Sequence, residues 1–123
     1  MADLRTILPE EFLSVVVDLG EVSPGAGIPL AYAGRLVDYL ATRNLGVLGG
    51  EGYVMGDDDW FHTYVVGMEN WAFDRRRGES HRKYVQRSIE GSRSVISRIE
   101  QDPRAAEIII EFGVVARDGR TFR

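Results

Sequence analysis

The sequence predicts an α+β fold, with an antiparallel sheet of about four strands packed against a long amphipathic helix and with two N-terminal helices. Three observations predict it: helical periodicity over residues 80–101, glycine-interrupted β-branched and aromatic segments over 45–73, and an apolar run over 108–115. The composition, 44% hydrophobic and 28% charged, is typical of a globular protein. We therefore expect residues 1–123 to form a single domain.

The first predicted helix begins at Pro9 and runs to Gly20, a residue that commonly follows a helix end. Glu10 and Glu11 lie in its first turn, where negative charge is favourable. The run Val15–Val17 opposes this interpretation, because β-branched side chains favour strands.

A loop is predicted over residues 23–27 from their proline and glycine content. A second helix is expected from near Pro29 to about Asn44, a suitable residue for the helix end. Its apolar face consists of Ala33, Leu36, Val37 and Leu40.

Strands are predicted from Leu45 onward. Extended segments lie on either side of Gly49-Gly50, and glycine inside a strand indicates a β-bulge or a close approach of another backbone. Residues 56–59 are expected to form a turn, and residues 61–66 and 71–73 to form the next strands.

A long helix is the clearest expected element, from about Ser80 to Gln101, and Asp102-Pro103 ends it. One face is apolar and the other is charged. The apolar face carries Val85, Ile89, Ser92, Ile96 and Ile99. The run over residues 108–115 then predicts a buried strand in the centre of the sheet.

The charge is unevenly distributed along the chain. Residues 1–74 hold 12 acidic residues and 3 arginines, whereas residues 75–123 hold 12 basic and 7 acidic residues. Such an asymmetry can steer a charged partner. The chain has no cysteine, and its start does not have the pattern of a secretory signal, so we expect a cytoplasmic protein with no membrane contact.

The sequence has no motif that is typical of a catalytic, nucleotide-binding or metal-binding site. The glycine-rich segments do not have the spacing of nucleotide-binding loops, and the single lysine, Lys83, lies inside the predicted long helix. His62 and His81 are isolated, and no serine has the setting of a hydrolase nucleophile. We therefore predict no catalytic, metal or cofactor site and no enzyme. Despite Arg75–Arg77, the net charge of −4 opposes nucleic-acid binding.

A protein-binding surface is the remaining interpretation. Aromatic residues cluster around an acidic turn, a combination that suits a partner with a basic surface. Trp60 is the expected exposed anchor, whereas Trp71 is expected in the core, and Tyr53 and Phe61 could serve either role. The predicted partner-binding residues are Glu51, Tyr53, Asp57, Asp58, Asp59, Trp60 and His62.

The segment Val47–Tyr53, followed by Asn70-Trp71, Gly78–Ser80 and Tyr84–Ser88, resembles the immunity protein 40 family of bacterial polymorphic toxin systems. The order and spacing of these motifs match over roughly residues 29–115. Two positions differ from the usual pattern of the family. Glu51 stands where an aspartate is usual, and Ala72 stands where an aromatic residue is usual.

This resemblance implies a cytoplasmic antitoxin that binds and blocks a cognate toxin domain. The acidic turn further suggests a basic, nuclease-type toxin, and we expect a monomer or a weak homodimer. The motifs can also serve the fold, with Gly49-Gly50 as a bulge, Ser80 as a helix N-cap and Trp71 in the core. The alternative function is a small enzyme or ligand-binding domain with a pocket near His62, Tyr53 and Glu51.

Overall fold

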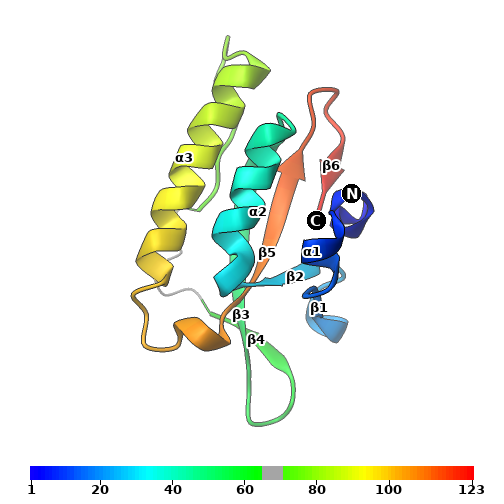
Figure 1. Ribbon diagram of the computed structural model, residues 1–123, viewed down its shortest axis with the longest axis vertical. Coiled ribbons are helices and arrows are strands. Elements are labelled where there is room, and N and C mark those ends of the chain that lie inside the picture. The colour runs from blue at the N-terminus through cyan, green and yellow to red at the C-terminus, as the bar shows by residue number, and fades with distance from the viewer. Residues whose placement is uncertain (65–70) are drawn as a thin grey trace.

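The computed structural model describes residues 1–64 and 71–123. Figure 1 shows the helices α2 and α3 side by side over one face of a curled antiparallel sheet, with the two ends of the chain close together beside β6. In chain order the elements, with 3-10 helices written η, are η1 (Leu4–Ile7), α1 (Glu10–Leu13), β1 (Val17–Asp18), η2 (Gly20–Val22), β2 (Ala26–Pro29), α2 (Leu30–Thr42), β3 (Gly46–Met55), β4 (Phe61–Thr63), α3 (His81–Ile99), η3 (Ala105–Glu107), β5 (Ile109–Val115) and β6 (Thr121–Phe122).

The α+β class is confirmed, and so are the two long helices. Helix α3 begins after Ser80, whose side chain accepts a hydrogen bond from the backbone of Lys83, as expected for an N-cap. Helix α2 ends at Thr42, and Asn44 takes a left-handed conformation just beyond it. None of the helices in the described part of the chain combines the length and apolar composition needed to span a bilayer.

The predicted helix over residues 9–20 is wrong beyond Leu13. The β-branched run bends into extended backbone, and Val17 and Asp18 pair with β2 as strand β1. Gly20 adopts φ 67° and begins the 3-10 turn η2 instead of ending a helix. The local preference of the valines therefore overrides the helical start.

Over residues 1–64 and 71–123 the sheet has six strands instead of about four. Its order is β1-β2-β5-β3-β4, and β6 pairs with β5 beyond the end of β2. The predicted loop over 23–27 is partly wrong, because its last two residues begin the buried strand β2. The central position of β5 and the turn after β3 are confirmed. Of the predicted strand 61–66, residues 61–63 form β4, and Val65 and Val66 lie outside the described residues.

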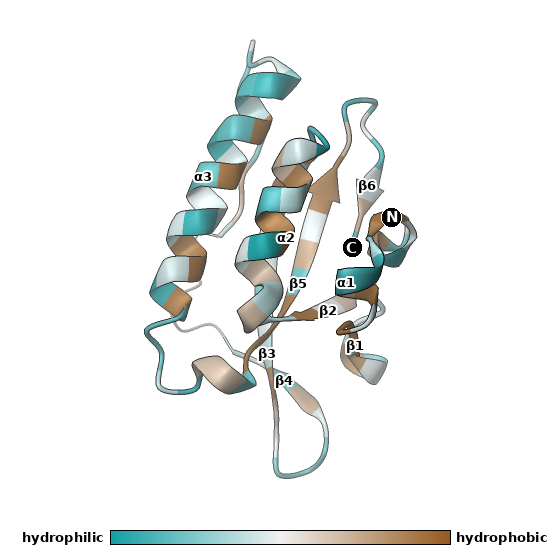
Figure 2. Cartoon of the chain, in the orientation of Figure 1, coloured by the Kyte–Doolittle hydropathy of each residue, from teal (hydrophilic) through white to brown (hydrophobic). Residues whose placement is uncertain are grey.

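The core lies between the helices and one face of the sheet. In Figure 2 apolar and polar bands alternate along α2 and α3, as expected for amphipathic helices. The buried sheet residues Ile28, Val47, Ile110, Phe112 and Val114 meet the apolar faces of both helices. Trp71 is part of the same core, as predicted, and packs edge-on against Phe112 with ring centroids 5.4 Å apart.

Buried polar contacts hold α3 against β3 and against the segment 71–73. The Tyr84 hydroxyl donates to the carbonyl oxygens of Val47 and Phe73, at 3.0 and 2.7 Å. The Ser88 hydroxyl accepts from the Val47 N–H at 3.0 Å, and the Ser92 hydroxyl accepts from the Trp71 indole at 3.1 Å. These contacts align α3 on the sheet, because each polar group is satisfied at only one position of the helix.

The predicted bulge is present directly before the glycine pair, since the pairing of β3 with β5 shifts between Val47 and Gly49. A Cβ atom on Gly50 would lie 2.8 Å from the Trp71 ring, and one on Gly49 would lie 2.4 Å from the Trp71 carbonyl oxygen. The glycine pair is therefore needed so that residue 71 can pack across β3.

Candidate functional site

The β3–β4 hairpin ends in a turn that projects from one end of the molecule (Figure 1). Trp60 is 52% exposed and Met55 is 44% exposed, values that are unusual for large apolar side chains. The turn between them carries Asp57, Asp58 and Asp59. Together with residues 18–21, which line a notch beside the hairpin, these residues form what we call the hairpin-tip surface; η2, which begins at Gly20, contacts β4.

Local hydrogen bonds fix the shape of this turn. One carboxylate oxygen of Asp58 accepts from the Trp60 backbone N–H at 3.1 Å, and both oxygens lie 2.9 Å from His62 Nε2. The His62 hydrogen bond, followed by the Trp60 N–H, lowers the pKa of Asp58 below its usual value. Asp59 adopts a left-handed conformation with φ 63°, which aspartate tolerates better than most residues. The acidic groups are thus presented on an ordered turn.

A shallow notch of about 370 Å³ separates the hairpin from η2. Its walls combine apolar side chains with carboxylates, and none of the described residues that line it is basic. The residues are Asp18, Leu19, Gly20, Glu21, Met55, Asp59, Trp60 and Phe61. Apolar anchors inside a polar rim are a common arrangement at protein-binding surfaces.

Glu51 and Tyr53 lie further along β3, on the sheet face that turns away from the helices. Tyr53 is only 3% exposed, and its hydroxyl donates to Glu51 Oε2 at 2.7 Å. Burial is the main cause that raises the pKa of Tyr53, and the Glu51 hydrogen bond raises it further. The phenol therefore stays protonated and holds the Glu51 carboxylate in place.

His62 lies on the other face of the hairpin. It pairs with Val54, whereas Tyr53 pairs with Thr63, and side chains of neighbouring positions in a strand point to opposite faces. The structure therefore does not bring His62 together with Tyr53 and Glu51 in one pocket. Among the described residues, no cluster of three or more metal-ligating side chains occurs either.

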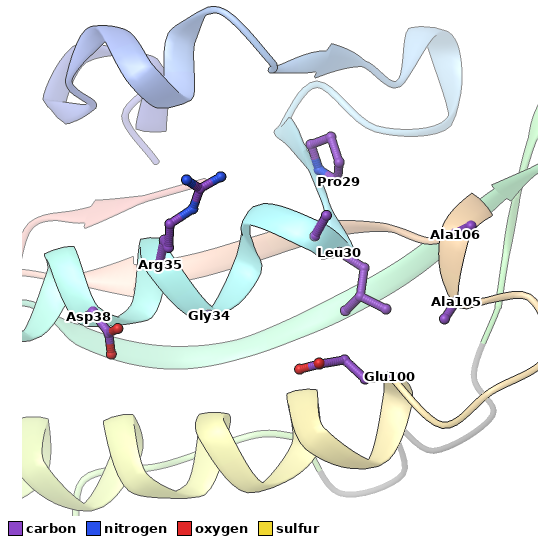
Figure 3. A pocket seen from close by; sticks show the side chains of 9 residues that line it. Pro29, Leu30, Gly34, Arg35, Asp38, Glu100, Ala105 and Ala106 are labelled. Carbon is purple, nitrogen blue, oxygen red and sulfur yellow. The ribbon is translucent and has the colours of Figure 1, made fainter.

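A pocket of about 560 Å³ lies between the start of α2 and the end of α3 (Figure 3). None of the predicted partner-binding residues lines it. Glu100 and Leu30 point into the space between the helices, whereas Arg35 points to the opposite side of α2. Small residues, Gly34, Ala105 and Ala106, form much of its remaining wall. Its charged groups do not converge on one point as a catalytic pair would.

Sequence reasoning missed three acidic residues near the predicted site. Asp18 and Glu21 join the hairpin-tip surface only because β1 and η2 fold beside β4. Glu111 lies directly opposite Glu51 on β5 and is 7% exposed. The sequence did contain a signal for Glu111, because it is the one acidic residue inside the apolar run of residues 108–115.

Comparisons with known proteins give one match. The family model of immunity protein 40 matches residues 22–114. No curated protein and no solved structure matches the chain. The matched region includes both the β3–β4 hairpin and the contacts of α3 with β3 and Trp71. The chain therefore belongs to the immunity protein 40 family.

Proposed function

We propose that this protein neutralises a cognate bacterial toxin domain by binding it directly, through the hairpin-tip surface, in the cytoplasm. Membership of the immunity family supports a role as a toxin inhibitor. The observation that carries the choice of surface is the exposed Trp60 beside Asp57–Asp59. Exposed tryptophan is the residue type that most often anchors a tight protein interface.

The chemistry of this surface indicates the class of toxin. Asp18, Glu21 and the three turn aspartates provide negative charge around the apolar notch. A nuclease binds the phosphates of its substrate with basic residues, so an acidic protein surface can occupy the same basic site. We infer that the cognate toxin is a basic, nuclease-type domain and that its substrate-binding side faces the hairpin tip.

Co-expression tests the function. The toxin domain encoded immediately upstream is produced in bacteria with and without this protein, and both survival and co-purification are measured. We expect rescue together with a stable complex. Rescue without any complex would contradict neutralisation by direct binding, and a neighbouring domain that is not toxic would remove the cognate partner.

A matched pair of variants tests the surface. Trp60→Ala removes the exposed anchor at the hairpin tip, and we expect it to weaken toxin binding by about 2 kcal/mol or more, since it would be a hot-spot residue. Leu13→Ala is the control, because Leu13 is also an exposed apolar residue but lies on α1. Equal affinities of the two variants for the toxin would exclude the hairpin tip as the anchor.

A further inference from the structure

The sheet face opposite the helices carries a shallow trough of about 300 Å³ beside the two glutamates that face each other across β3 and β5. Its floor includes Gly49 and Gly113, which are also directly opposite each other. Gly113 has no side chain and a Cβ there would meet only Leu48, so the backbone of β5 is open to a ligand at this position. Met1, Leu48, Ala72 and Arg123 also line the trough.

Two carboxylates meet at one end of this trough. Glu51 and Glu111 are paired residues on neighbouring strands, so their Cβ atoms are expected about 5 Å apart, and like charges at this spacing repel. Glu51 accepts its hydrogen bond from Tyr53, and Glu111 Oε2 accepts one from Ser23. Both donors are neutral, so neither offsets the charge.

Within the described residues neither glutamate forms an ion pair, although Met1, which carries the N-terminal amino group, and Arg123 line the same trough. Glu111 is 93% buried, since 7% of its surface is exposed, yet in the described part of the chain its Oε1 accepts no hydrogen bond. Glu111 is one of the residues that line the trough.

We infer that this trough receives one basic side chain, an arginine or a lysine, of the toxin, and that Glu51 and Glu111 pair with its cationic group. The inference rests on the proposed function and adds a second contact to it. The cation removes the repulsion between the carboxylates, and the glycine floor leaves space for the aliphatic part of the side chain.

The trough and the hairpin-tip surface lie on the same face of β3. Glu51, Tyr53 and Met55 alternate onto the same face of β3, because no bulge intervenes between them. Four residues of extended strand place Glu51 about 13 Å from Met55. That distance is within the width of an ordinary protein interface, so one toxin surface reaches both places.

Gly113→Val tests this inference without removing a polar group. A Cβ atom at position 113 would meet only Leu48, at 3.4 and 3.9 Å, so the larger side chain fits the fold and fills the trough. Valine is also a better strand residue than glycine, and we expect the free energy of unfolding to be unchanged or higher. Affinity for the toxin domain encoded upstream should fall at least tenfold.

Glu51→Gln and Glu111→Gln test the charge. Each keeps a side-chain oxygen to accept from Tyr53 or Ser23, and each should weaken toxin binding at least tenfold. Glu90→Gln, an exposed glutamate on α3, is the control and should bind the toxin as the wild type does.

The outcomes separate this inference from the proposed function. If the wild-type protein binds the toxin and Gly113→Val and Glu51→Gln bind it equally well, the trough receives no toxin side chain and only the inference fails. If Glu111→Gln binds the toxin as tightly as the wild type does, the carboxylate pair holds no toxin cation, and the inference is also overturned. If the wild-type protein itself does not bind, the proposed function fails.

Discussion

At the scale of single residues, the motifs shared with the family mainly build the packing of α3 on β3. Gly50 leaves space for the Trp71 ring, and Ser92 accepts the indole N–H. The burial of Trp71 could be predicted from its sequence, because tryptophan in an apolar segment is usually buried. Its partners could not, since Ser92 lies 21 positions away and the contact exists only once helix and sheet have packed.

Ser92→Ala measures the value of this contact. The substitution leaves the buried Trp71 N–H without its acceptor, so we expect the free energy of unfolding to fall by about 1–3 kcal/mol. Urea denaturation measures the free energy of unfolding of each variant. Ser94→Ala, an exposed serine on the same helix, is the matched control and should change stability by less than about 0.5 kcal/mol. Equal stabilities of the two variants would show that the indole finds water or another acceptor.

At the scale of secondary-structure elements, the sequence predicted the long elements whose apolar residues recur at regular spacing. Helix α3 spans 19 residues, and its apolar residues recur at helical spacing, so its existence and start were predictable. Strands β1 and β6 contain two residues each, too few for alternation to be detected. Strand β2 carries Gly27 and Pro29, which favour loops, and it exists because β5 offers it hydrogen bonds.

An ion pair joins α3 to the segment before it. Arg87 contacts both carboxylate oxygens of Glu79, at 2.9 and 2.8 Å, and also donates to the Asp74 carbonyl oxygen at 2.6 Å. The Arg87 hydrogen bond is the main cause that lowers the pKa of Glu79, from 4.5 to about 2. The charged pair therefore ties residues 74–79 to the first half of α3.

The pH dependence of stability tests whether the ion pair between Arg87 and Glu79 stabilises the fold. Because the pKa of Glu79 is lower in the folded protein than its usual 4.5, its stabilising effect is full above pH 4.5 and is lost as the pH falls toward about 2. The melting temperature of Glu79→Gln should therefore lie below that of the wild type at pH 6 and approach it near pH 2. Glu90→Gln serves as the control. A Glu79→Gln difference that stays constant over this range would contradict the role of the ion pair.

At the scale of the whole molecule, charge is separated along the long axis. The acidic β3–β4 turn lies at one end, and the segments 74–80 and 116–120, which include Arg75–Arg77 and Arg117, lie at the other (Figure 1). The residue counts predicted that charge is unevenly distributed along the chain. The direction of this asymmetry in the folded molecule depends on the topology, because the topology places the two arginine-bearing segments together. Such a dipole orients the hairpin tip toward a basic partner during approach.

The most direct test of the central claim is the association rate with the toxin domain at increasing salt concentration. The test variant is Asp57→Asn, Asp58→Asn and Asp59→Asn combined, because asparagine also tolerates the left-handed conformation at position 59. The control, Glu10→Gln, Glu11→Gln and Glu90→Gln combined, removes the same charge from exposed sites on α1 and α3.

We predict that the turn variant associates at least tenfold more slowly than the control at low salt, and that its rate depends much less on salt, because the acidic turn provides the steering. If the turn variant and the control show the same rate and the same salt dependence, the hairpin tip is not the surface that meets the toxin.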